Sequence, residues 1–288
     1  MLQVALLTNY NINYKLASAI TVADKLHEFD CNILVPEDYR ERIESSQKQH
    51  VAWEYVDLES VYKLSDMIIV LGGDGTIMES ARRSAQRGTP ILGINLGRVG
   101  YLSELEIDEL HLLENVMNGK YFLDKRTMLN AAVIDRNGNE RASSFALNDA
   151  VISNGSIARM VDLQLYEGGT LINTYHADGL IIATPTGSTA YSMSAGGPVA
   201  DPRISCFCAT PICPHLSSSR PILFPDDSVI EVKNVCKREK MLYLTLDGRV
   251  NFELMKNDVV RITKSDLTAS IIRVKKRSFY DKLRQKTK

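Results

Sequence analysis

Residues 67–80, MIIVLGGDGTIMES, pass from an apolar run to three glycines around one aspartate and then to a helix-like pattern. The run 67–71 predicts a buried strand, and 77–87 predicts a helix. Thr76 is followed by Glu79 at the spacing of a capping box, so we expect the helix to begin at Thr76. A strand, a glycine turn and a helix start leave backbone N–H groups free, which predicts an anion site.

The same alternation of short apolar runs and helical patterns continues on both sides of this segment. Strands are expected at 4–8, 32–36, 67–71 and 90–94, and helices at 17–29, 77–87 and 107–118. This order is typical of a parallel sheet with helices on both faces. We therefore predict a Rossmann-like α/β domain over residues 1–125.

From residue 126 the chain changes to short strand-like runs separated by turn signals. The expected strands are 128–136, 145–153, 160–166, 171–175, 180–184, 228–233, 241–246, 258–263 and 269–275, with turns at 136–139, 167–169 and 247–248. This spacing predicts an all-β, sandwich-like domain over residues 126–274. The basic tail 275–288 is predicted to be a helix that docks on the first domain through Phe279, Tyr280 and Leu283.

The bulk composition argues against a nucleic-acid or membrane partner. The formal net charge is −1, so no global field attracts a polyanion, and no apolar stretch approaches a membrane span. Five cysteines at irregular spacing favour reduced thiols and a cytoplasmic location.

The aspartate of the opening segment, Asp74, is open to two interpretations. The chain contains neither G-x-x-x-x-G-K-[ST] nor G-x-G-x-x-G, since Met78 stands where the last glycine would be. A carboxylate beside a phosphate site repels the ligand unless a cation intervenes or the carboxylate accepts a proton, and phosphoryl transfer needs both roles. Alternatively, Asp74 only caps the turn. Residues 71–80 by themselves favour neither interpretation of Asp74 over the other.

Two further segments carry polar groups suited to a nucleotide. In 178–199, DGLIIATPTGSTAYSMSAGGPV, a predicted strand runs into a turn whose three hydroxyls are expected to face one point, with Tyr191 available for a base to stack on. A Ser/Thr-rich helix start is the alternative. In 146–153, ALNDAVIS, Asn148 and Asp149 lie within an apolar strand, where a bulge could direct both to a ribose diol.

Two other kinds of site are disfavoured. Cys206, Cys208, Cys213 and His215 lie close together, but C-x-C is not the usual zinc spacing, so a structural zinc is the weaker interpretation and no metal ligand is assigned. No G-x-S-x-G motif is present, which disfavours a serine hydrolase.

In their order along the chain, these segments resemble the NAD kinase family. The motifs are G-G-D-G-T at 72–76, G-I-N-x-G-x-x-G-Y-L at 93–102, N-D at 148–149, D-G-x₅-P-T-G-S-T-A-Y-S at 178–192, and P-H-x-x-S-x-R-P at 214–221. G-G-D-G alone also occurs in lipid kinases, whereas P-T-G-S-T-A-Y is more specific.

The resemblance implies an α/β domain and a β domain with the active site between them. It implies that ATP, with a divalent cation such as Mg²⁺, phosphorylates the adenosine-ribose 2′-hydroxyl of NAD, and that Asp74 accepts the proton. Homodimers or homotetramers are implied as well. The residues it implies for nucleotide binding are Asp74, Gly75, Asn148, Asp149, Arg159, His176, Asp178, Thr189, Ala190, Tyr191, Ser192, Met193 and Ser194.

The chain departs from the family pattern at a few positions. Asp149 stands where glutamate is expected, and Arg249 stands where the family often has glutamine, which leaves a role for Arg249 or Asp247 open. Two other functions remain as alternatives: a lipid or sugar kinase built on the same glycine–aspartate turn, and a non-catalytic NAD-sensing protein.

Overall fold

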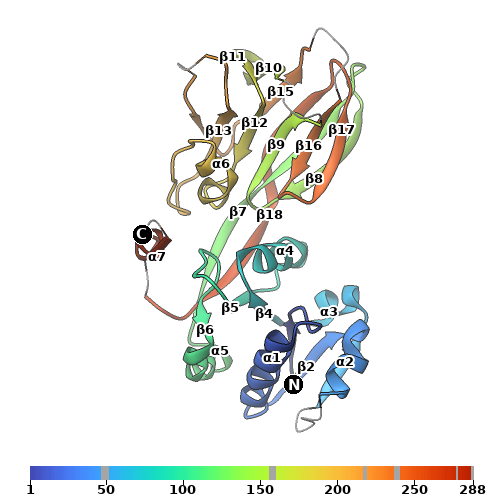
Figure 1. Ribbon diagram of the computed structural model, residues 1–288, viewed down its shortest axis with the longest axis vertical. Coiled ribbons are helices and arrows are strands. Elements are labelled where there is room, and N and C mark those ends of the chain that lie inside the picture. The colour runs from blue at the N-terminus through green and yellow to red at the C-terminus, as the bar shows by residue number, and fades with distance from the viewer. Residues whose placement is uncertain (47–51, 156–159, 217–218, 237–240, 277, 287–288) are drawn as a thin grey trace. The chain divides into compact units, whose positions relative to one another are not determined.

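The computed structural model describes residues 1–288 except 47–51, 156–159, 217–218, 237–240, 277 and 287–288. The chain forms two compact units, Met1–Lys125 with Ala269–Lys288, and Arg126–Thr268. Each unit has a hydrophobic core of its own. Figure 1 shows the course of the chain through both.

A parallel β-sheet forms the centre of the first unit. Its strands lie in the order β18, β5, β4, β1, β2, β3, with the short β6 beside β5, and their pairings are parallel. β4 and β5 are buried along their whole length, which is why their sequences are continuous apolar runs. The bounds are β1 Leu2–Leu7, β2 Cys31–Pro36, β3 Trp53–Val56, β4 Met67–Gly72, β5 Ile91–Asn95, β6 Leu105–Glu106 and β18 Val259–Arg273.

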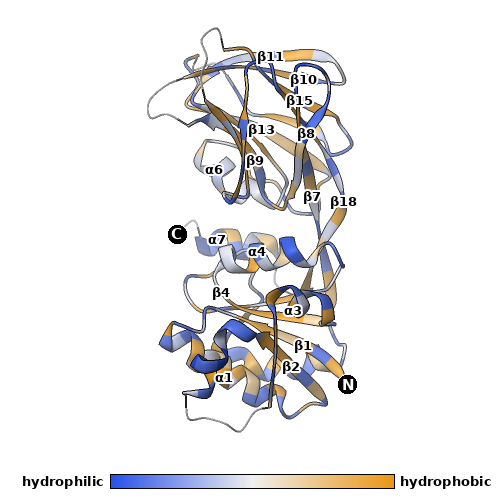
Figure 2. Ribbon diagram, turned by 90° about the vertical axis from the view of Figure 1, so that its right-hand side faces the viewer, coloured by the Kyte–Doolittle hydropathy of each residue, from blue (hydrophilic) through white to orange (hydrophobic). Residues whose placement is uncertain are grey.

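Helices cover both faces of this sheet. On one face Leu16 and Ile20 of α1 pack in the same cluster as Leu6. Side chains alternate between faces along a strand, so Gly93 and Leu92 of β5 face opposite sides of the sheet. Leu92 lies in the cluster that contains α1 residues, and Gly93 lies against Ile77 of α4, so α4 covers the other face. Figure 2 shows the apolar colouring of the strands and the mixed colouring of the helices. The helices are α1 Asn13–Leu26, η1 Glu37–Tyr39, α2 Arg40–Glu44, α3 Leu58–Leu64, α4 Asp74–Ser84, η2 Ile107–Leu112, α5 Leu113–Met117 and α7 Phe279–Lys286.

Two antiparallel sheets share one core in the second unit, which confirms the predicted β-sandwich class. One sheet has the order β14, β13, β12, β9, β16, β17, and the other contains β11, β10, β15 and β18 with β7 and β8. The bounds are β7 Phe122–Ile134, β8 Glu140–Ala146, β9 Asp149–Asn154, β10 Val161–Glu167, β11 Thr170–Ala177, β12 Gly179–Ala183, β13 Cys206–Ile212, β14 Ile222–Pro225, β15 Ile230–Asn234, β16 Leu242–Leu246 and β17 Val250–Leu254, with η3 Gly187–Thr189 and α6 Tyr191–Ser194.

Several strand predictions need correction. The two runs 258–263 and 269–275 belong to one long strand, β18. Its last residues lie in the first unit, because Ile271 pairs with Ile91 there, so residues 269–274 do not lie in the second unit. No strand was predicted at β13, which is buried at every residue and therefore shows no alternation of apolar and polar positions.

The register of the first sheet brings two glycine-rich turns side by side. In the parallel pair β4 and β5, Gly72 is opposite Asn95, so both strands end at the same edge. The turn at 73–75 and the loop at 96–102 both leave from this edge. In open parallel sheets the carboxyl ends of strands are the usual place for ligands.

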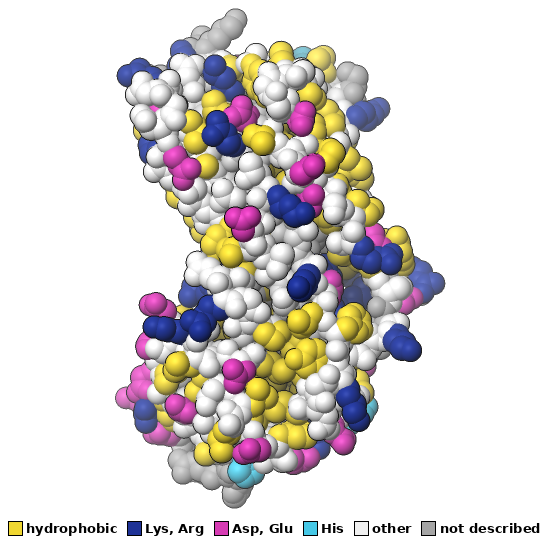
Figure 3. All heavy atoms as spheres, turned by 180° about the vertical axis from the view of Figure 1, so that it is seen from behind, with side chains coloured by type: hydrophobic (Ala, Val, Ile, Leu, Met, Phe, Trp, Pro, Cys, Tyr) yellow, Lys and Arg dark blue, Asp and Glu magenta, His cyan; other side chains and the backbone are white. Residues whose placement is uncertain are grey.

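The surface carries no dominant charge on the face drawn in Figure 3. Basic and acidic side chains are interspersed there, in keeping with the net charge of −1. Among the described residues, none of the helices has both the length and the apolar character needed to cross a membrane.

Candidate active site

Asp74 joins the two glycine-rich turns of the first unit. Its Oδ2 accepts a hydrogen bond from the backbone N–H of Tyr101 at 2.8 Å, and its Oδ1 accepts one from Leu102 at 3.0 Å. The aspartate therefore holds a neighbouring loop as well as standing at the start of α4. These two hydrogen bonds fix the direction of its carboxylate.

The glycines around this carboxylate have two different tasks. A Cβ on Gly100 would lie 2.0 Å from Asp74 Oδ1, so a side chain there is incompatible with the contact. Gly73 and Gly75 have nothing within 4 Å of their would-be Cβ positions and are exposed. The loop thus needs glycine for close packing, whereas the turn has room for a ligand.

The predicted start of α4 and its capping box are wrong. The helix begins at Asp74 after Gly73, two residues earlier than expected. Glu79 instead binds Arg82 at 3.2 Å and Arg83 at 2.7 Å. Two arginines at i+3 and i+4 offer this carboxylate stronger, charge-assisted partners than a backbone N–H at the helix start.

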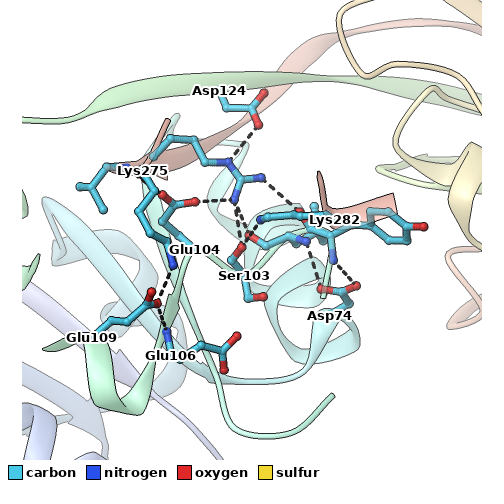
Figure 4. A network of polar contacts seen from close by, with 12 residues as sticks. Asp74, Ser103, Glu104, Glu106, Glu109, Asp124, Lys275 and Lys282 are labelled. Atoms are coloured by element: carbon cyan, nitrogen blue, oxygen red, sulfur yellow. Dashed lines mark hydrogen bonds and ion pairs between the residues drawn. The ribbon is translucent and has the colours of Figure 1, made fainter. Parts of the chain in front are cut away.

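The carbonyl groups of the same loop are held by the C-terminal part of the chain (Figure 4). Arg273, at the end of β18, is 8% exposed and sits among acceptors. Its guanidinium donates to the carbonyl oxygens of Tyr101, Leu102 and Ser103 and to the carboxylates of Glu104 and Asp124, at 3.1 to 3.3 Å. The loop is therefore bonded at its N–H groups by Asp74 and at its carbonyl groups by Arg273.

Helix α7 adds two lysines to this network. Lys282 donates to the carbonyl oxygens of Tyr101, at 3.2 Å, and Ser103. Lys286 Nζ lies 3.1 Å from Asp74 Oδ2 and 4.3 Å from the centre of the Tyr101 ring. The ring of Phe279 lies 5.9 Å from that of Tyr101, so the tail contacts the loop through apolar and charged groups.

The second unit contains a pocket of about 440 Å³ that brings several predicted residues together. Four of the residues expected to bind nucleotide line it: Asn148, Asp149, Ala190 and Tyr191. Thr245, Asp247 and Gly248 contribute from the hairpin of β16 and β17, and Val151 and Ser153 from β9.

Asp247 shapes this pocket by interrupting a strand. Its carboxylate accepts backbone hydrogen bonds from Leu147, Asn148 and Asp149 at 2.9, 2.7 and 3.2 Å. The predicted continuous strand 145–153 is therefore two strands, with Leu147 and Asn148 between them. Backbone N–H groups bonded to a carboxylate are not available to a sheet ladder, which explains the break.

Asp149 is an unusual carboxylate within this pocket. Its side chain is buried, at 5% exposure, and the negative charge of Asp247 lies nearby. Burial first, and then Asp247, raise the pKa of Asp149 from 3.8 to about 7. Near neutral pH this group exists in both protonation states, so it can either donate or accept a hydrogen bond.

The hydroxyl groups of the 184–189 turn bond within the protein, contrary to the expectation that they face a ligand. Thr186 Oγ1 accepts a hydrogen bond from Arg126 at 3.3 Å, Ser188 Oγ donates to Pro185 O at 2.7 Å, and Thr189 Oγ1 donates to Thr186 O at 3.2 Å. A Cβ on Gly187 would lie 2.0 Å from Asn148 O. The turn therefore acts as a support on which Asn148 rests.

The other predicted residues do not line this pocket. His176 is exposed, with Nδ1 2.7 Å from Asp162 Oδ1, and Asp178 is exposed at the start of β12. Ser192 is buried and bonds Thr210 at 2.9 Å. Thr189, Met193 and Ser194 lie on or beside α6 without lining the pocket, and Arg159 lies outside the described residues.

The cysteine-rich segment separates in the structure. Cys206 and Cys208 are buried on β13, whereas Cys213 is exposed beyond its end. The ring of His215 lies near that of His176, 5.9 Å between centres. In the described part of the chain, no three His, Cys, Asp or Glu side chains gather as a metal site.

Three residues that hold the loop of the first unit were not predicted, and the role of Asp247 in the second unit was left open. Arg273, Lys282 and Lys286 act across more than 170 positions of sequence, and no local motif signals such contacts. Asp247 had a signal, because it opens an Asp-Gly turn with a positive φ of 51°, but the turn alone does not reveal what its carboxylate binds.

Comparison with known proteins defines the class. Residues 4–121 match the family model for the ATP-NAD kinase N-terminal domain, and residues 147–274 match that for the C-terminal domain. The fold agrees: yeast NADH kinase complexed with NADH superposes with a TM-score of 0.88 at 24% identity, covering 100% of this chain and 87% of that one. An NAD kinase from Archaeoglobus fulgidus in complex with ATP gives 0.72 at 24%, covering 98% of each chain.

Curated relatives fix the assignment more narrowly. The NAD kinase of Geobacter metallireducens is 40% identical over 247 residues, 85% of this chain and 87% of that protein. The NAD kinase of Symbiobacterium thermophilum is 48% identical over 222 residues, 77% of this chain and 78% of that protein. The chain belongs to the NAD kinase family and is an enzyme of that family.

Proposed function

We propose that this enzyme transfers the γ-phosphoryl group of ATP to the 2′-hydroxyl of the adenosine ribose of NAD. A bond forms between the ribose 2′-oxygen and the γ-phosphorus, and the bond from that phosphorus to the β,γ-bridging oxygen breaks. ADP leaves with that oxygen, and the hydroxyl proton passes to Asp74. The products are NADP, ADP and a proton.

The observation that carries this proposal is the fixed carboxylate beside open space. Asp74 keeps 30% of its side-chain surface exposed, and two backbone N–H groups of the next loop set its orientation. Among the described residues, Leu102 is the donor to Oδ1, so this oxygen has a lone pair left for a hydroxyl proton. A carboxylate held in this way is suited to general-base catalysis.

The glycine turn supports a place for phosphate groups. Gly73 and Gly75 are exposed with open space around them, and α4 begins between them. The first N–H groups of a helix lack intrahelical partners and attract anions. We propose that phosphate oxygens of the substrates lie against this turn.

A divalent cation fits this site as a companion of the nucleotide. Mg²⁺ typically keeps several waters and binds through one or two carboxylates plus substrate phosphates, so it needs no protein cage. Asp74 is the carboxylate of the glycine turn that could contact it. When bound, such an ion supplies charge neutralisation for the phosphates.

In the second unit we propose that the pocket lined by Asn148 and Asp149 binds part of the dinucleotide. An amide and a carboxyl group together match the donors and acceptors of a ribose diol. Tyr191 is 48% exposed at the same pocket, so its ring is accessible to a base. By family resemblance we extend NAD contact to Arg159, His176, Asp178, Thr189 and the residues 192–194.

The experiment that tests the function is direct. Purified enzyme is incubated with NAD, ATP and Mg²⁺, and NADP is measured with an NADP-specific dehydrogenase. NADP that accumulates with ADP at a ratio of one supports the proposal. Phosphorylation of a lipid or sugar without NADP, or NAD binding without ATP consumption, would refute it.

We also infer a reducing compartment, the cytoplasm, and assembly as a homodimer or homotetramer. All five cysteines are free, and Cys213 is exposed, which suits a compartment that keeps thiols reduced. The assembly follows from family resemblance, and light scattering of the purified protein measures it.

A further inference from the structure

The C-terminal helix places a cation on the carboxylate of the glycine turn. Lys286 Nζ bonds Asp74 Oδ2 at 3.1 Å while lying over the ring of Tyr101. The side chains of Lys286 and Asp74 remain 33% and 30% exposed, so a ligand can reach both. The contact joins residues 212 positions apart.

We propose that Lys286 is a phosphate-binding residue of the active site, which contacts the phosphates of ATP beside Asp74. The proposal rests on the function proposed above and adds a residue to it. A polyphosphate that approaches a carboxylate is repelled, and a cation between the two removes this repulsion. G-G-D-G-T contains no basic residue of its own, unlike the P-loop motif G-x-x-x-x-G-K-[ST], which contains a lysine.

The contacts of Lys286 are of a kind that a phosphate can replace. A partly exposed ion pair contributes little to stability, and a cation–π contact of a partly exposed ammonium is weak. Lysine is a compact point charge on a flexible stem with three donors. It can keep one donor on Asp74 and offer the others to phosphate oxygens.

The first turns of α7 are held by contacts with the loop 96–102, whereas Lys286 at its C-terminal end is accessible to a ligand. Lys282, one turn earlier, is bonded to the carbonyl oxygens of Tyr101 and Ser103, and Phe279 contacts the Tyr101 ring. Helix α7 therefore holds Lys286 in a defined place. The buried hydroxyl of Tyr101 has no hydrogen-bond partner in the described part of the chain, which is consistent with a polar ligand nearby.

Four variants of the enzyme test the proposal. Lys286→Met removes the cation, and Lys286→Arg retains it. Arg284→Met is the matched control, since it removes a cation from the same helix that is paired with Asp281 and largely exposed. Arg98→Met tests a basic residue of the loop 96–102, which lies beside the glycine turn. Steady-state rates with varied ATP and NAD are combined with calorimetric binding of a non-hydrolysable ATP analogue and with melting temperatures.

We expect Lys286→Met to raise the KM for ATP and the Kd of the analogue by about 10- to 100-fold, the range for a lost charged hydrogen bond. The KM for NAD should change less than about threefold, and Lys286→Arg should recover most of the ATP affinity, because a charge is restored. Arg284→Met should match the wild type.

Distinct results would overturn the proposal. Unchanged ATP affinity in a folded Lys286→Met enzyme removes Lys286 as a ligand. A higher kcat or tighter ATP binding in that variant would show that Lys286 instead blocks access to Asp74. A loss confined to Arg98→Met assigns the role to that residue. If the wild-type enzyme forms no NADP, the proposed function itself is refuted. This outcome is distinct from unchanged ATP affinity in Lys286→Met, which refutes only the role of Lys286.

Discussion

At the scale of single residues, two aspartates in this protein do opposite things with the same functional group. Asp74 accepts hydrogen bonds from two backbone N–H groups and from a lysine. Asp149 is buried near another carboxylate, which disfavours its charge. The sequence predicted that both residues matter, but the fold brings each of them its own neighbours: hydrogen-bond donors to Asp74 and a second carboxylate to Asp149.

Replacing Asp74 by asparagine tests both of its tasks. We expect kcat to fall at least ~100-fold, the lower range for loss of a general base, with NAD binding retained. An asparagine has one acceptor oxygen for the N–H groups of Tyr101 and Leu102, so one of them loses its partner. The free energy of unfolding should therefore fall by about 1–3 kcal/mol.

Steady-state kinetics, calorimetric NAD binding and urea unfolding of the Asp74→Asn enzyme measure these effects. Turnover equal to that of the wild type would remove Asp74 from the chemistry. Normal unfolding together with lost turnover would show that the loop contact is energetically unimportant.

The raised pKa of Asp149 predicts how the free energy of unfolding changes with pH. The folded protein keeps the Asp149 proton up to about pH 7, whereas an unfolded aspartate, with a pKa of 3.8, loses it earlier. The folded state therefore binds more protons in this window, and its stability falls as pH rises from about 4 to 7, by up to about 4 kcal/mol.

Asp149→Asn removes this titration. Relative to the wild type, its free energy of unfolding should increase between pH 5 and pH 8, measured by urea unfolding at several pH values. Glu140→Gln, an exposed carboxylate on β8, is the control and should show no such trend. A difference between Asp149→Asn and wild type that is constant across pH would contradict the pKa assignment.

At the scale of elements, turns in close contact build the candidate site in each of the two units. The sequence predicted the strands before both glycine turns, since their apolar runs are continuous and bounded by glycines. It did not predict that the loop 96–102 is bonded to the first turn through Asp74, nor that the 184–189 turn supports Asn148. Contacts between loops depend on strand register, which local patterns do not encode.

Gly100→Ala should disrupt the loop because its Cβ would overlap Asp74 Oδ1. We expect a loss of about 1–3 kcal/mol in unfolding free energy, as in overpacked sites, and at least a tenfold loss of kcat/KM. Gly97→Ala is the matched control on the same loop, where a Cβ meets nothing within 4 Å. Equal behaviour of the two variants, in melting and in NADP formation, would show that the loop adapts freely.

At the scale of the whole molecule, the C-terminal residues Ala269–Lys288 join Met1–Lys125 to complete the first unit. The end of β18 pairs with β5, and Arg273 then binds the loop and the carboxylate of Glu104. The predicted α/β and β-sandwich classes are confirmed. The long crossing strand was predicted as two strands, because polar residues such as Lys264 and Asp266 interrupt its apolar pattern.

Arg273→Met should be one of the most damaging single changes outside the hydrophobic cores. It leaves the buried carboxylate of Glu104 without its guanidinium partner, and breaking a buried pair typically costs about 3–5 kcal/mol. Arg261→Met, on the same strand, breaks an exposed pair with Glu231 and should cost less than about 1 kcal/mol. Comparable melting temperatures for the two variants would refute the role given to Arg273.

The sequence by itself determined the strand and helix classes, the glycine turns and the family. Such features are local, because apolar periodicity, turn residues and short motifs each depend on residues that are close together in the sequence. Only the tertiary structure decided that Asp74 holds the loop of Tyr101 and Leu102, that Asp247 interrupts a strand beside Asp149, and that Lys286 lies on the carboxylate. The physical reason is that hydrogen bonds and charge interactions depend on distances of a few ångströms, and the fold alone sets these between residues far apart in sequence.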